Sequence, residues 1–77
     1  MSAVNIAESL ALVQEYWRPK VIAQLNGQEV KVVRVKGEFV WHHHEDVDEL
    51  FWVLQGELRI EFRERTVTLH AGEMLVV

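Results

Sequence analysis

The stretch from Gly37 to Gly56 constrains the fold more than any other part of the chain; it reads G-E-F-V-W-H-H-H-E-D-V-D-E-L-F-W-V-L-Q-G. An apolar run, three adjacent histidines, an acidic segment and a second apolar run follow one another in it. This order predicts a β-hairpin with strands at 39–44 and 49–54. Residues 45–48 then form a four-residue loop, which is a common length in hairpins.

The register of this hairpin brings three potential metal ligands to one face. If His44 lies opposite Glu49, His42 lies opposite Phe51. Side chains alternate along a strand, and opposite residues in an antiparallel pair share a face. His42, His44 and Glu49 therefore converge. Two imidazoles and one carboxylate make a metal site with open positions, suited to redox iron and also to zinc or manganese.

The other face of the predicted hairpin is mainly apolar. It carries His43, which is therefore not expected to be a ligand, together with Trp41, Leu50 and Trp52. We expect these two tryptophans and Leu50 to be buried, while Phe51 and Val53 continue the metal face inward as an apolar pocket. The alternative for the histidines is structural, with each ring bonded to a neighbouring carbonyl.

The spacing of these residues resembles a known family motif. His42-x-His44, four residues, Glu49, six residues and Gly56 are similar to the first conserved motif of the cupin superfamily. Four residues separate Gly37 from His42, one fewer than is usual in that motif. The resemblance covers roughly residues 28–77. It implies a small β-barrel or jelly roll with a metal in its mouth, and it implies His42, His44, Glu49 and a further histidine of a second motif as ligands.

The resemblance also implies two kinds of function. The first is a metalloenzyme of dioxygenase, isomerase or decarboxylase type acting on a small polar metabolite. The second is a non-catalytic module that binds a small ligand or a metal. In both, the implied cofactor is one divalent transition metal: Fe, Mn, Zn, Ni or Co. Oxygen consumption with a redox-active metal favours the enzyme, whereas a pocket that is inert to oxygen favours the binding module.

Before this stretch, residues 5–18 are predicted to form a helix. Asn5 can cap it, with Glu8 completing a capping box, and Pro19 ends it. Apolar residues at helical spacing form one stripe: Ile6, Leu10, Val13 and Trp17. We expect this stripe to cover a barrel side or a dimer seam and to bury Trp17.

The rest of the chain alternates between strands and short turns. Asn26-Gly27 is a strong hairpin signal, and the charged residues of 57–63 are expected on a solvated strand face. The predicted architecture is all-β and mainly antiparallel, a cupin-like barrel with one N-terminal helix, in a single domain over residues 1–77. The expected strands lie at 20–25, 28–36, 57–62, 66–69 and 74–77.

Composition excludes several classes of partner and chemistry. The chain has 77 residues, no cysteine and a net charge of -4 without a basic block. Disulfide and thiolate chemistry is therefore absent, and nucleic acid is not an expected partner. No apolar run approaches the ~20 residues of a membrane span, and no signal peptide is evident, so we expect a cytoplasmic protein without a membrane partner.

The end of the sequence predicts self-association. Residues 71–77 resemble the cupin stretch that precedes the second metal-binding motif, but that motif and the closing strands are absent, so the barrel is expected to be incomplete. An apolar edge strand at 74–77 pairs readily with another chain. We therefore expect a homodimer in which exchanged strands complete the sheets. The other expected partner is a small-molecule ligand.

Overall fold

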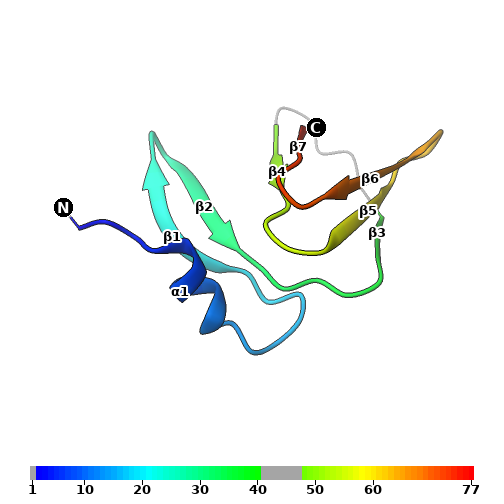
Figure 1. Cartoon of the computed structure of the whole chain (residues 1–77). Helices are drawn as coiled ribbons and strands as arrows, with labels where there is room; N and C mark the ends of the chain where they lie inside the picture. The colour runs from blue at the N-terminus through cyan, green and yellow to red at the C-terminus, as the bar shows by residue number, and fades with distance from the viewer. Residues whose placement is uncertain (1, 41–47) are drawn as a thin grey trace. The chain divides into compact units, whose positions relative to one another are not determined.

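The computed structural model describes residues 2–40 and 48–77, and in them one short helix and seven strands. Contacts divide the chain into two compact units, Met1–Lys36 and Gly37–Val77. Figure 1 shows the helix and one hairpin in the first unit and the remaining strands in the second. This is the all-β, cupin-like architecture with one N-terminal helix that the sequence predicted, and the single domain over 1–77 stays a prediction.

The helix α1, Ile6–Ala11, begins where the sequence predicted. The side chain of Asn5 accepts a hydrogen bond of 2.9 Å from the backbone N–H of Glu8. The hydroxyl of Ser9 donates to the carbonyl oxygen of Asn5, also at 2.9 Å. The first of these bonds satisfies a backbone N–H that the first turn of a helix leaves free.

The predicted end of this helix, at residue 18, is wrong, because a distant arginine takes the carbonyls that further turns would use. Arg34 donates from Nε to the carbonyl of Val13 at 2.6 Å and from Nη2 to that of Leu10 at 3.4 Å. The N–H of Trp17 donates to the carbonyl of Arg34 at 2.7 Å, and Trp17 has a φ of 62°. Trp17 is 43% exposed, so its predicted burial is also wrong.

The strands β1, Lys20–Leu25, and β2, Gln28–Val32, form the predicted antiparallel hairpin. Asn26 and Gly27 connect them with φ values of 52° and 78°. Two adjacent positive φ angles are typical of a type I′ turn, whose twist matches that of the strands. β2 is shorter than the predicted 28–36, ending at Val32, which is buried.

The second unit contains two small sheets. Its strands are β3 (Glu38–Val40), β4 (Leu50–Trp52), β5 (Glu57–Glu61), β6 (Thr66–His70) and β7 (Met74–Val76). In one sheet, β3 pairs in parallel with β5, and β5 pairs antiparallel with β6. In the other sheet, β4 pairs antiparallel with β7.

The core of this unit follows the predicted alternation along β5. Leu58 and Ile60 are buried, Ile60 completely, while Glu57 and Arg59 are exposed. Leu69 of β6 lies opposite Leu58 in the register and is buried as well. The β5–β6 hairpin therefore supplies the inner wall of this unit from one face of each strand.

The pairing of the histidine stretch differs from expectation in the described residues. There, β3 pairs with β5 and β4 pairs with β7, pairings that the sequence did not predict, and the predicted hairpin itself stays a prediction. The residues that the prediction placed opposite β4, 41–44, lie outside the described residues. Leu50 and Trp52 are more than half exposed, so their predicted burial is wrong.

Candidate metal centre

Glu49 is the predicted metal ligand that the structure describes. Its N–H donates to the carbonyl of Val77 and its carbonyl accepts from the N–H of Val77, each at 2.9 Å. This reciprocal pair extends the β4–β7 ladder by one step and fixes the Glu49 backbone against β7. The other two predicted ligands, His42 and His44, lie outside the described residues, as does His43.

Alternation along β4 separates a sheltered face from an open one. Val53 is buried and Phe51 is half-buried, whereas Leu50 and Trp52 are exposed. Glu49 is two residues before Phe51, so it belongs to the same face as Phe51 and Val53. Burial on this face increases along the strand, from Glu49, which is exposed, through Phe51 to Val53. The sequence predicted this grouping of Glu49 with Phe51 and Val53.

An aromatic contact links β3 and β4 at Phe51, two residues after Glu49. The rings of Phe39 in β3 and Phe51 in β4 have centroids 5.6 Å apart and are tilted by 56°. Phe39 lies beside Ile60 in the parallel register of β3 and β5. Phe51 therefore joins the two sheets of the unit through an apolar contact. The contact between Phe39 and Phe51 was not predicted from the sequence.

The described residues add no further ligand set. No group of three or more His, Cys, Asp or Glu side chains among residues 2–40 and 48–77 could hold a metal ion. No polar or charged residue in this part of the chain is buried. The predicted ligand set of His42, His44 and Glu49 therefore stays a prediction.

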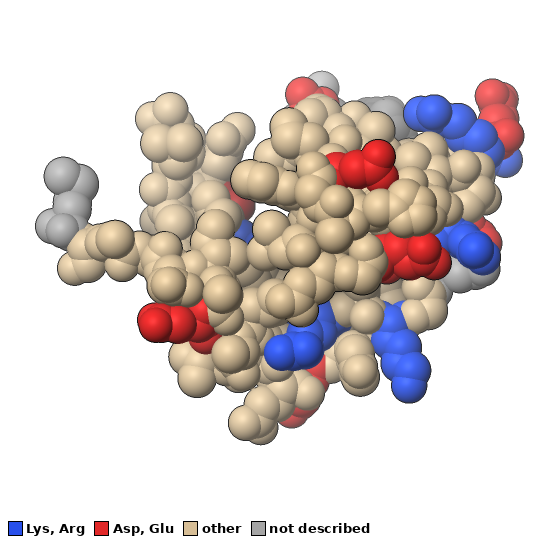
Figure 2. All heavy atoms as spheres, viewed as in Figure 1, with Lys and Arg blue, Asp and Glu red and all other residues tan. Residues whose placement is uncertain are grey.

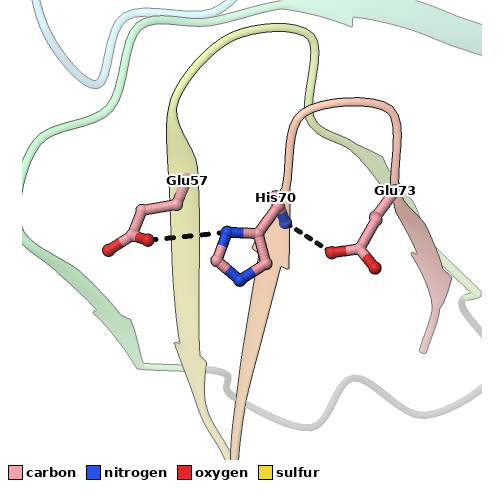
Figure 3. Close-up of polar contacts among 3 residues, drawn as sticks. All are labelled: Glu57, His70 and Glu73. Carbon is pink, nitrogen blue, oxygen red and sulfur yellow. Dashed lines mark hydrogen bonds and ion pairs between the residues drawn. The ribbon is translucent and has the colours of Figure 1, made fainter.

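The fourth histidine makes polar contacts elsewhere in the unit (Figure 3). Nδ1 of His70 lies 3.7 Å from Oε2 of Glu57, and the backbone N–H of His70 donates to Oε1 of Glu73 at 2.7 Å. Both side chains of the His70–Glu57 pair are more than half exposed. The antiparallel register that places Glu57 opposite His70 is the signal that would have predicted this pair.

The face shown in Figure 2 carries both positively and negatively charged side chains. Lys and Arg side chains lie among Asp and Glu side chains there, separated by uncharged residues. Within the described ranges, the chain has no helix with the length and hydropathy that crossing a bilayer requires.

Comparison with known proteins agrees with this architecture. The uncharacterized protein YdbB of Bacillus subtilis (strain 168) is 44% identical over 57 residues, which are 73% of this chain and 50% of that protein. A solved structure, that of a cupin-2 domain containing protein from Shewanella frigidimarina NCIMB 400, has a TM-score of 0.89 and 47% identity. It is matched over 96% of this chain and 72% of that chain.

The chain thus spans half the length of the curated relative and nearly three quarters of the solved chain. The matching family model is described as a cupin domain, and it covers residues 24–77, which is more than two thirds of the sequence. The match includes the histidine stretch, Glu49 and every strand of the second unit. The chain belongs to the cupin family.

Proposed function

We propose that this domain binds one divalent transition metal through His42, His44 and Glu49. The observation that carries the proposal is the placement of Glu49. Both its backbone N–H and its carbonyl are hydrogen-bonded to Val77, and its position belongs to the sheltered face of β4. A carboxylate on a fixed strand position is a suitable anchor for a metal, because the ligand geometry must be held by rigid elements.

The donor set fits a transition metal. Neutral imidazoles and a carboxylate suit Fe, Mn, Zn, Ni or Co, and three protein ligands leave positions open for other molecules. When bound, such a metal would supply a Lewis acid or a redox centre for a ligand that coordinates it through oxygen. Glu49 would contribute its carboxylate, and the two histidines their imidazole nitrogens.

The apolar surface beside Glu49 would receive the rest of the ligand. Phe39 and Phe51, whose rings are in contact and half-buried, would offer carbon surface there. A small polar metabolite would therefore be held mainly through the metal, with its carbon skeleton against Phe51. Pockets of this kind combine apolar walls with few polar contacts.

Metal analysis with matched variants tests this proposal. We expect one metal per chain in the wild type. His42→Ala, His44→Ala and Glu49→Ala should each reduce metal affinity at least about tenfold, because each removes a direct ligand. His43→Ala is the matched control and should leave affinity nearly unchanged. Equal loss in His43→Ala and His44→Ala would contradict the assigned ligands.

A non-catalytic role is the second candidate, and one observation favours it. General acid–base catalysis uses a positioned proton-transfer group. Glu49 would be engaged by the metal, and no ionisable side chain of the described residues is buried. Oxygen uptake or turnover of a metabolite by the metal-loaded protein would establish the enzyme. Stoichiometric ligand binding without turnover would establish the binding module.

A further inference from the structure

The tip of the β1–β2 hairpin carries an asparagine, Asn26, directly followed by a glycine, Gly27 (Figure 1). Both residues are exposed. The register places Leu25 opposite Gln28 on either side of them. Because the hydrogen bond that closes a two-residue turn joins the flanking residues, the closure of this turn does not use the backbone N–H of Gly27.

The surroundings of this N–H are open. A Cβ added at Gly27 would meet no atom within 4 Å. Gly27 has no side chain of its own to shield the nitrogen, and exposed loop tips open locally more easily than core strands do. When the tip opens, the Gly27 nitrogen can approach the side-chain carbonyl carbon of the preceding residue, Asn26. The two groups then have the connectivity that closes a succinimide ring.

We propose that Asn26 is a site of spontaneous deamidation. The Gly27 nitrogen loses its proton and bonds to Cγ of Asn26, while the bond from Cγ to the side-chain nitrogen breaks. That nitrogen takes up the proton and leaves as ammonia, and a cyclic succinimide remains. One water molecule then opens the ring. The step requires no oxidant, reductant or enzyme, and it does not depend on the metal site.

Water opens the ring at either of its two carbonyl groups. Cleavage of the bond between the Gly27 nitrogen and Cγ gives an aspartate at position 26 in an otherwise normal chain. Cleavage of the bond to the backbone carbonyl carbon leaves a chain that runs through Cβ and Cγ, which is isoaspartate. Both products add one negative charge, and isoaspartate alone inserts an extra carbon into the backbone.

The two products affect the hairpin differently. Asn26 has a φ of 52°, and aspartate tolerates this left-handed conformation. Isoaspartate lengthens a loop whose two-residue length sets the turn type and the register of the strands. We therefore expect isoaspartate, and not aspartate, to loosen the pairing of β1 with β2.

The other asparagine of the chain, Asn5, is an internal control. Its side-chain oxygen accepts a hydrogen bond of 2.9 Å from the backbone N–H of Glu8, so its amide is held at the start of α1. The residue that follows it is Ile6, whose branched side chain crowds the nitrogen that would attack. Asn5 should therefore keep its amide while Asn26 loses it.

Peptide mapping of the aged full chain tests the proposal. The folded protein is incubated in mildly alkaline buffer at physiological temperature, digested with trypsin and compared with a sample taken before incubation. Cleavage after Lys20 and Lys31 releases Asn26 in the peptide 21–31. Asn5 lies in the N-terminal peptide. We expect the peptide 21–31 to convert progressively to the mass of the acid, in two chromatographic forms, while the N-terminal peptide keeps its amide.

Fragment spectra assign the change to Asn26 and not to the glutamines beside it. Retention of the amide in both peptides would overturn the proposal, as would conversion at Asn5 as fast as at Asn26. Conversion in urea without conversion of the folded protein would also overturn it, because the turn would then protect the amide.

Two variants separate the chemistry from its effect on the hairpin. Asn26→Gly is the matched variant, because two glycines also form this type of turn. It should fold and should form no acidic product on ion-exchange chromatography, and an acidic product that persists would overturn the assignment to Asn26. Asn26→Asp supplies the charge without the added backbone carbon. Backbone hydrogen exchange in β1 and β2 should be faster in the isolated isoaspartate form than in Asn26→Asp, and equal rates would contradict the proposed effect on the hairpin.

Discussion

Arg34 holds the end of α1 from a position 21 residues away, through a hydrogen bond of 2.6 Å from its Nε to the carbonyl oxygen of Val13. Its other contacts lie in the same part of the chain. Nη2 donates a hydrogen bond to the carbonyl of Leu10, and the backbone of Arg34 forms a parallel β-bridge with that of Tyr16. Lys36 adds a cation–π contact, with Nζ 5.7 Å from the centroid of the Tyr16 ring. One side chain thus ties the helix end to the strand segment that follows β2.

Replacing this arginine should destabilise the first unit. Arg34→Ala removes charge-assisted bonds to two carbonyls of a mostly exposed helix end, so we expect a loss of about 1 kcal/mol in the free energy of unfolding. Arg18→Ala is the control, because the Arg18–Glu15 pair at 3.0 Å is highly exposed and should contribute little. Urea unfolding followed by tryptophan fluorescence measures both. Equal effects from the two changes would contradict the role of Arg34.

Gly27 should be sensitive to substitution for reasons of backbone conformation alone. Its φ is 78°, and a Cβ added there would meet nothing within 4 Å. Gly27→Ala should therefore cost about 1 kcal/mol through the left-handed conformation and not through a clash. Gly27→Asn should cost less, because asparagine tolerates this conformation better. Thermal unfolding of the two variants measures the difference, and a larger loss for Asn than for Ala would contradict this explanation.

Ile60 should dominate the stability of the second unit. Its side chain is fully buried between strands that supply the inner wall. Ile60→Ala should lower the free energy of unfolding by about 2–5 kcal/mol, and Ile60→Val by about 0.5–1.5 kcal/mol. Chemical denaturation measures both changes. If Ile60→Ala were no more costly than Ile60→Val, this residue would not be a core residue.

Local signals in the sequence predicted much of the fold. The Asn5 cap, the Asn26-Gly27 turn and the alternation along β5 each depend on residues a few positions apart, and all three are confirmed. The spacing of His42, His44 and Glu49 indicated the family before the fold was known. Such signals act through short-range geometry, which the sequence displays directly.

The errors arise where distant residues compete for the same groups. The helix ends early because Arg34 takes the Leu10 and Val13 carbonyls, which no pattern within residues 5–18 reveals. The pairing of β4 with β7, more than twenty positions away, was not predicted, and Trp52 of β4 is exposed where the sequence predicted burial. The metal ligands were derived from a hairpin register in residues 41–44, so the candidate site stays a prediction beyond the position of Glu49.

Metal affinity should fall as the pH is lowered, if His42 and His44 are ligands. Each imidazole must be neutral to bind, so affinity is fully present above its pKa and is lost as the pH falls through it. With ordinary imidazole values near ~6.5, two ligands should approach about a hundredfold loss per pH unit at lower pH. His44→Ala should approach about tenfold per unit, whereas His43→Ala should keep the wild-type slope. Competition titrations with a metal indicator at several pH values measure these slopes. A wild-type affinity that is constant from neutral to acidic pH would show that the histidines do not hold the metal.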